Sequence, residues 1–110
     1  MEKQRREVNN MDTDLIELST PGEVLKEEFL DPMGITSYAL AKAIFVDPPR
    51  IDAIIKGKRE ITADTAIRLS RFFGTTPSFW TNMQSRYDIE LLMEQKGAEF
   101  GSITHHHVAS

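Results

Sequence analysis

The sequence predicts an all-α domain of five helices. Three observations lead to this fold class. Apolar residues recur at spacings of three and four, which is typical of amphipathic helices. Capping residues and glycines divide the chain into five such segments. No segment alternates between apolar and polar residues for long enough to indicate a strand.

The first helix is predicted from a strong start signal. Thr20 is a helix-capping residue, Pro21 takes the first helical position, and Glu23 completes a capping box. Apolar residues then recur at helical spacing over 24–29. The Asp-Pro-Met-Gly segment at 31–34 is expected to end this helix.

The second and third helices are predicted to form a helix-turn-helix. The second begins after the cap Thr36 and runs to about Ile44, and the third begins after Asp47 and ends at Gly57. Two prolines after Asp47 mark the turn. The apolar positions of 37–54 fit this motif: Leu40, Ala41, Ile44, Val46, Ile51 and Ile54. The second helix of such a motif lies in the DNA major groove.

Two further helices complete the expected domain. The fourth runs from the cap Thr62 to Phe73 and ends at Gly74. Its predicted buried residues are Ala66, Ile67, Leu69 and Phe73. The fifth begins at Thr76 and fades near 95–97. One side of it carries Phe79, Trp80, Met83, Tyr87 and Leu91.

These segments divide the chain into three parts. Residues 1–19 form a polar and charged arm that we expect to be mobile, and 20–96 form the helix-turn-helix domain. Residues 97–110 form a flexible tail of small residues and histidines.

The charge of the chain is unevenly distributed. The 13 Lys and Arg and 17 Asp and Glu give a formal net charge of -4, yet the segment 37–71 is net positive. Its basic residues are Lys42, Arg50, Lys56, Lys58, Arg59, Arg68 and Arg71. This local excess fits an electrostatic footprint for nucleic acid. By themselves, the charges fit solvated helix faces equally well.

The third predicted helix has a buried and an exposed face. Ile51, Ile54 and Ile55 lie at i, i+3 and i+4 and share the buried face. On the other side, Arg50 could donate two hydrogen bonds to guanine, and Asp52 could accept one from cytosine. The alternative for Asp52 is an ion pair with a nearby basic side chain of the protein. Cations at the helix end and the N–H groups that begin the second helix suit phosphates. The expected DNA-binding residues are Thr36, Ser37, Tyr38, Pro49, Arg50, Asp52, Ala53, Lys56, Lys58 and Arg59.

Phe45 breaks the pattern at the turn between these helices. Helix-turn-helix proteins usually have glycine there, because glycine takes a positive φ without steric cost. A bulky residue in that conformation is strained. We therefore expect one of two outcomes: the segment 47–49 carries the reversal instead, or packing holds Phe45 in place. The angle between the two helices, and with it the depth of groove entry, therefore stays open at the level of sequence.

The residues do not support an enzymatic site. The sequence has neither a Gly-rich phosphate loop nor a Ser/His/Asp arrangement, and its three histidines lie in the tail. Consecutive residues such as His105–His107 cannot converge on one metal ion in a fixed geometry. The absence of cysteine excludes disulfides and thiolate sites and fits a reducing cytosol. We expect a cytoplasmic protein without enzymatic activity, cofactor or metal, and no apolar run reaches the roughly 18 residues of a membrane span.

Beyond the helix pattern, the chain carries linked motifs in a fixed order. They are Pro-Gly-Glu-Val-Leu-Lys-Glu-Glu-Phe-Leu at 21–30, Leu40-Ala41, Gly-Lys-Arg-Glu-Ile-Thr-Ala-Asp-Thr-Ala at 57–66, Arg-Leu-Ser-Arg-Phe-Phe-Gly-Thr at 68–75, Pro-Ser-Phe-Trp at 77–80 and Gln-Ser-Arg-Tyr-Asp at 84–88. Together they resemble the HigA antitoxin family, a branch of the lambda-repressor-like helix-turn-helix proteins. The resemblance covers about 19–91. It departs at Phe45, and at Asp47 and Asp52, which make the third helix less basic than in many members.

This resemblance implies the function of an antitoxin in a bacterial type II toxin–antitoxin module. A member of the family binds and neutralises a HigB-type toxin, an mRNA-cleaving ribonuclease. It also binds as a homodimer to the palindromic operator of its own promoter and represses its operon. The toxin partner is implied by the resemblance alone, whereas DNA binding is also predicted from the motif and the charges.

A dimer has a physical rationale, because two half-sites about 34 Å apart match a protein with two-fold symmetry. The fifth helix is the best candidate for the interface, since its apolar arc is wider than a small core needs. The expected interface residues are Met83, Tyr87, Ile89, Leu92 and Met93. Phe79 and Trp80 suit the core of the monomer at least as well.

Two other functions stay open at the level of sequence. One is a stand-alone helix-turn-helix repressor without a toxin. The other is a protein-interaction module that has lost DNA binding, which is suggested by Phe45, by the acids of the third helix and by the net negative charge.

Overall fold

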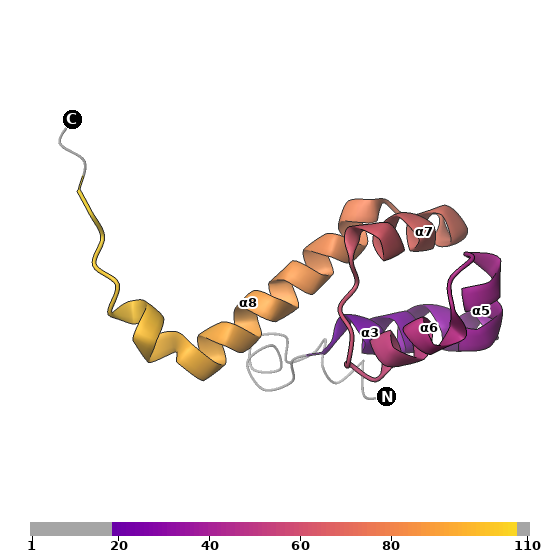
Figure 1. Ribbon diagram of the computed structural model, residues 1–110, viewed down its shortest axis with the longest axis horizontal. Helices are drawn as coiled ribbons and strands as arrows, with labels where there is room; N and C mark the ends of the chain where they lie inside the picture. The colour runs from indigo at the N-terminus through magenta and orange to yellow at the C-terminus, as the bar shows by residue number, and fades with distance from the viewer. Residues whose placement is uncertain (1–18, 108–110) are drawn as a thin grey trace.

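The computed structural model describes residues 19–107, which form helices in the predicted order (Figure 1). The first helical segment comprises α3 (Pro21–Val24), a π-helical stretch η1 (Leu25–Leu30) and α4 (Asp31–Met33). It is followed by α5 (Ser37–Ala43), α6 (Pro48–Ile55), α7 (Ala63–Phe73) and α8 (Pro77–Gly101). The all-α fold class is confirmed, and residues 19–107 contain no strand. The predicted arm lies outside the described residues except for Ser19.

The predicted start signals form the expected caps. The Thr20 Oγ1 accepts a hydrogen bond from the Glu23 N–H at 3.1 Å, and the Glu23 carboxylate accepts one from the Thr20 N–H at 3.0 Å. Three other threonines cap their helices through the first of these two bonds alone: Thr36, Thr62 and Thr76. Asp47 holds the cap position of α6, but its side chain makes no capping hydrogen bond. Each cap satisfies a backbone N–H that would otherwise lack a partner.

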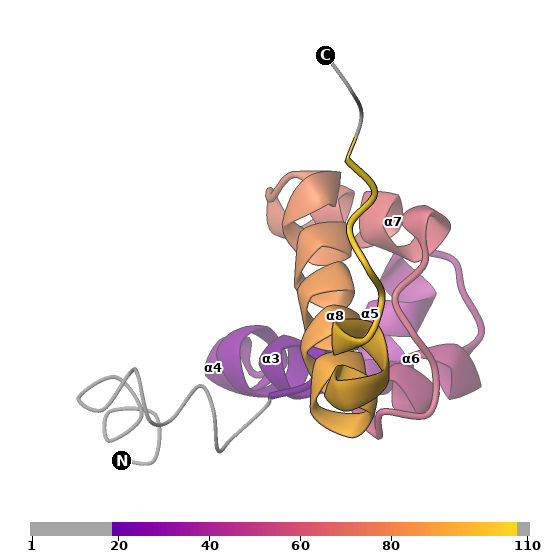
Figure 2. The ribbon, with the colours of Figure 1, turned by 90° about the vertical axis from the view of Figure 1, so that its left-hand side faces the viewer.

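The helices up to α7 gather with the first half of α8 around one apolar core (Figures 1 and 2). Its buried residues are Leu25, Leu30, Leu40, Ala41, Ile44, Ile51, Ile54, Ile61, Ala66, Leu69 and Trp80. Trp80 is fully buried, and its Nε1–H donates to the Thr75 Oγ1 at 2.8 Å. This tryptophan therefore anchors α8 to the domain and completes the monomer core.

Two helix predictions are corrected by the structure. Ile67 was predicted to be buried on α7, but it is 49% exposed. It follows the buried Ala66 directly, and a rotation of about 100° per residue turns it away from the core. The fifth helix was predicted to fade near 95–97, yet α8 continues to Gly101 across a kink at Lys96 (φ -131, ψ 24). None of the helices in the described part of the chain has the length and apolar character that crossing a bilayer requires.

Gly22 permits the close approach of α3 to α6. A Cβ at this position would overlap the carbonyl oxygen of Ile54 and lie 2.8 Å from the Cα of Ile55. Both obstacles are backbone atoms at the end of α6, which cannot rotate away as a side chain would. The absence of a side chain at Gly22 thus allows the short distance between α3 and the end of α6.

Phe45 adopts the left-handed conformation that the motif requires, with φ 63. The turn is therefore not remodelled in the way we expected. Nor is the ring held by packing, because the residue is 86% exposed. The turn is instead secured through its backbone: Arg68 of α7 donates from Nη1 to the carbonyl oxygens of Ile44 at 2.8 Å and of Phe45 at 3.4 Å.

We expect Phe45→Gly to stabilise the domain by about 0.5 to 1 kcal/mol. Glycine relieves the steric strain of the left-handed backbone, and this gain is larger than the conformational entropy that glycine loses on folding. The exposed ring contributes little burial that could be lost. Urea unfolding of the two proteins measures the difference. A variant that is less stable than the wild type would show that the exposed ring holds the turn.

Candidate nucleic-acid interface

The unit α5–α6 packs as the sequence pattern predicts. Leu40 and Ala41 of α5 and Ile51 and Ile54 of α6 are all buried in the core. The small Ala41 allows the two helix backbones to approach each other. This arrangement leaves the opposite side of α6 free to face a partner.

The exposed side of α6 carries Pro49, Asp52 and Lys56, with Ala53 half-buried beside them. Within the described range 19–107, the Asp52 carboxylate does not pair with a basic side chain. It accepts a hydrogen bond of 2.8 Å from the hydroxyl of Ser37. This bond ties the start of α5 to the middle of α6, so the structure brings these two predicted site residues together.

The start of α5 places its three predicted residues in different roles. Thr36 is the helix cap, because its Oγ1 accepts from the Ala39 N–H at 3.0 Å. Ser37 holds Asp52. Tyr38 is exposed, and the Lys42 ammonium lies 6.0 Å from the centre of its ring. Tyr38 is thus free for a partner and is not packed into the domain.

Arg50 is engaged by an acid that the sequence reasoning did not single out. Its Nη1 lies 3.2 Å from the Oδ2 of Asp64, at the start of α7, and the same oxygen accepts from the Arg68 Nε at 2.8 Å. The hydrogen bond from Arg68, and then that from Arg50, lowers the pKa of the Asp64 carboxyl. Asp64 and Arg50 are 14 residues apart, so no helical spacing connects them in the sequence.

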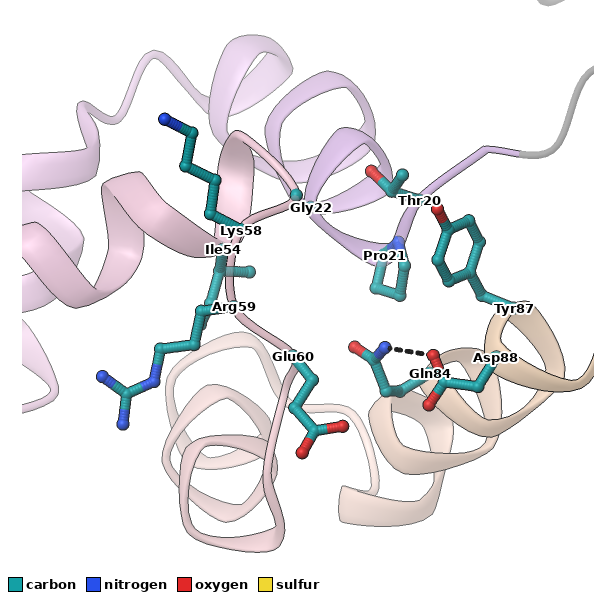
Figure 3. A pocket seen from close by; sticks show the side chains of 11 residues that line it. Thr20, Pro21, Gly22, Ile54, Lys58, Arg59, Glu60, Gln84, Tyr87 and Asp88 are labelled. Carbon is teal, nitrogen blue, oxygen red and sulfur yellow. Dashed lines mark hydrogen bonds between the residues drawn. The ribbon is translucent and has the colours of Figure 1, made fainter. Parts of the chain in front are cut away.

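The turn after α6 presents Lys58 and Arg59, both of which point away from the adjoining cavity (Figure 3). Together with Lys56 they are exposed and form no ion pair with another residue of 19–107. Gln84 of α8 holds the end of this turn, since its Oε1 accepts from the Ile61 N–H at 2.8 Å. The Gln84 Nε2 donates to Asp88 at 3.0 Å, as Figure 3 shows. This buried glutamine was not predicted from the sequence.

The predicted interface residues of α8 divide between two faces of the helix. Met83 packs against the core, and Tyr87 lines the cavity beside Thr20. Ile89, Leu92 and Met93 lie at i, i+3 and i+4 on the other face, where all three are exposed. Figure 1 shows that this part of α8 extends away from the remaining helices.

The described part of the chain holds no group of three or more His, Cys, Asp and Glu that could bind a metal ion. His105, His106 and His107 lie exposed beyond the end of α8.

An α5–α6 pair packed at a buried alanine, with the exposed face of α6 next to a basic turn, defines a helix-turn-helix domain. The helix-turn-helix family matches residues 25–80 of the chain. Virulence-associated protein I of Dichelobacter nodosus is 51% identical over 76 residues, which are 69% of this chain and 70% of that protein. Antitoxin HigA-1 of Vibrio cholerae is 48% identical over 68 residues, which are 62% of this chain and 64% of that protein.

A solved structure agrees with these sequence relatives. The antitoxin HigA of Pseudomonas aeruginosa, solved with the higBA promoter, is 38% identical and superposes with a TM-score of 0.77 over 80% of this chain and 97% of that one. The chain belongs to the HigA antitoxin family of helix-turn-helix proteins.

Proposed function

We propose that the chain is a DNA-binding antitoxin that represses its own operon in the cytoplasm. The observation that carries this proposal is the exposed face of α6 beside three cations without an ion-pair partner among residues 19–107. Phosphates are the natural partners of such cations. The relative from Pseudomonas aeruginosa, with which the chain shares its fold, was solved with promoter DNA. The left-handed turn at Phe45 supports groove entry by α6, since it preserves the geometry of the motif.

The proposed contacts separate into two kinds. Arg50 reads a base, because a guanidinium donates two hydrogen bonds to the major-groove edge of guanine. Pro49 and Ala53 lie beside it on α6, and Asp52 holds the register of α6 against α5 through Ser37. Phosphates are contacted by Tyr38 and the start of α5 and by the exposed cations Lys56, Lys58 and Arg59.

Single alanine variants distinguish these two kinds of contact. Arg50→Ala is expected to cost about 1–3 kcal/mol on operator DNA and little on random DNA, because only the operator offers the matching base. Lys58→Ala is expected to weaken binding to both DNAs alike and to reduce the dependence of affinity on salt. Fluorescence anisotropy at several salt concentrations measures both. Identical behaviour of the two variants on both DNAs would refute this division of contacts.

We further propose that the protein binds its operator as a homodimer through the exposed α8 face of Ile89, Leu92 and Met93. An apolar surface of this kind on a helix that leaves the domain is typical of an interaction site. Met83 and Tyr87 support the same helix from its inner face. The matching variant is treated in the Discussion.

The second part of the proposed function is neutralisation of a HigB-type, mRNA-cleaving toxin. It is supported by the family to which the chain belongs and by the net acidic charge outside the segment 37–71, which is complementary to a basic RNA-cleaving partner. The test is co-expression with the product of the adjacent reading frame. Growth should be restored by this chain, and failure to restore it would leave a repressor without a toxin as the better description.

A further inference from the structure

The strongest unexplained feature of the motif is the pairing of its predicted base reader with an acid. Asp64 accepts hydrogen bonds from both Arg50 and Arg68, and Arg68 in turn holds the carbonyl oxygens of the turn at 44–45. One carboxylate on α7 therefore joins the turn before α6 to a side chain on the first turn of α6.

This arrangement leaves Arg50 able to bind a partner. Among residues 19–107, Arg50 hydrogen-bonds to Asp64 through Nη1 alone, so its donors on Nε and Nη2 remain for a further acceptor. Two guanidiniums share one carboxylate, which leaves the three groups with a net positive charge. The assembly is thus still attractive to DNA, and it holds the guanidinium fork in one place.

Holding the fork matters because a free arginine has many rotamers. Binding DNA through such a side chain normally carries the cost of ordering it. When Asp64 orders Arg50 in the free protein, that cost falls on folding and not on binding. The affinity increases only for DNA that places a guanine against the Arg50 guanidinium. The ordering of Arg50 therefore raises the preference for one DNA sequence over another.

We propose that Asp64 is the positioning residue for base reading by Arg50, an inference that rests on the proposed function. In this proposal Asp64 contacts Arg50 and does not contact the DNA base. Its effect is therefore on the ratio of operator affinity to random-DNA affinity. A residue that merely stabilised the fold would change both affinities together.

The test compares Asp64→Asn with a matched control, Asp47→Asn. Both remove one acidic charge at the start of a helix of the domain, but the Asp47 side chain makes no capping hydrogen bond. Asp64→Asn is expected to lower the operator-to-random ratio by about two- to tenfold, the effect of freeing one long side chain. Asp47→Asn should raise both affinities equally and leave the ratio unchanged. A ratio in Asp64→Asn that equals or exceeds that of the wild type overturns the proposal.

The Arg50→Ala background tests the same assignment by a double-mutant cycle. There, Asp64→Asn should cause no further fall in the ratio, because the side chain that it positions is gone. A second fall of the same size would overturn the proposal. Should circular dichroism show Asp64→Asn to be unfolded, Asp64→Ser is measured with the same expectations, since serine suits the first turn of a helix.

A measurement without DNA separates this proposal from the proposed function. The Nε–H signal of Arg50 in NMR relaxation should be ordered in the wild type and should lose that order in Asp64→Asn. Unchanged order would overturn the role of Asp64 whatever the DNA results. Failure of the proposed function appears instead in the wild type, as equal binding to operator and random DNA.

Discussion

Met93→Glu on α8 is expected to convert the proposed dimer to a monomer and to lower the affinity for operator DNA by about 100-fold. The reason is that two linked half-site contacts reinforce each other, and a monomer makes only one of them. A buried carboxylate at the centre of an apolar interface has no partner to offset its desolvation. Light scattering measures the mass, and fluorescence anisotropy measures the affinity.

Met33→Glu is the matched control for this variant. Met33 at the end of α4 and Met93 on α8 have nearly the same exposure, 53% and 54%, so the two substitutions add the same charge to equally exposed methionines. Met33→Glu should remain a dimer. If Met93→Glu is also dimeric, the interface does not lie on this face of α8.

Gly22→Ala is expected to destabilise the domain by about 3 kcal/mol, at the upper end of the usual cost of overpacking. The added methyl group overlaps the backbone at the end of α6, so it can be accommodated only by moving α3 and α6 apart. For a domain of this size such a change lowers the midpoint of thermal unfolding by about 10 °C or more. Thermal and urea unfolding measure the effect.

Gly97→Ala makes the same substitution in open space on α8, where no atom beyond the adjoining residues and helix backbone lies within 4 Å of the added Cβ. It should leave the stability unchanged or raise it by about 0.5–1 kcal/mol, because alanine is the better helix former. Equal stability of Gly22→Ala and the wild type would mean that the packing of α6 does not depend on the close approach of α3 at Gly22.

The parts of the fold that could be predicted from the sequence are those fixed by local interactions. The capping box of Thr20 and Glu23 acts within a single turn, so its sequence signature is sufficient. The same holds for the apolar spacing that buries Ile51 and Ile54. Ile67 shows the limit of this reasoning, because hydrophobic character alone does not tell which side of α7 faces the core.

The parts of the candidate site that could not be predicted depend on contacts between distant segments. Asp64 meets Arg50 only because the fold brings the start of α7 within reach of a long side chain on the first turn of α6. Gln84 meets the backbone of Ile61 across 23 residues of sequence. Phe45 differs again: its left-handed φ follows from the motif, but its exposure was not foreseen, since the turn is held through the backbone by Arg68.

The most direct test of the account is a gel shift with the DNA upstream of the protein's own operon, compared with scrambled DNA of the same length. We predict saturable binding to the operator at low salt, at least about 10³ times tighter than to the scrambled sequence and weaker as salt rises. Absence of binding at low salt, or equal binding to both DNAs, would contradict the claim that this helix-turn-helix reads an operator.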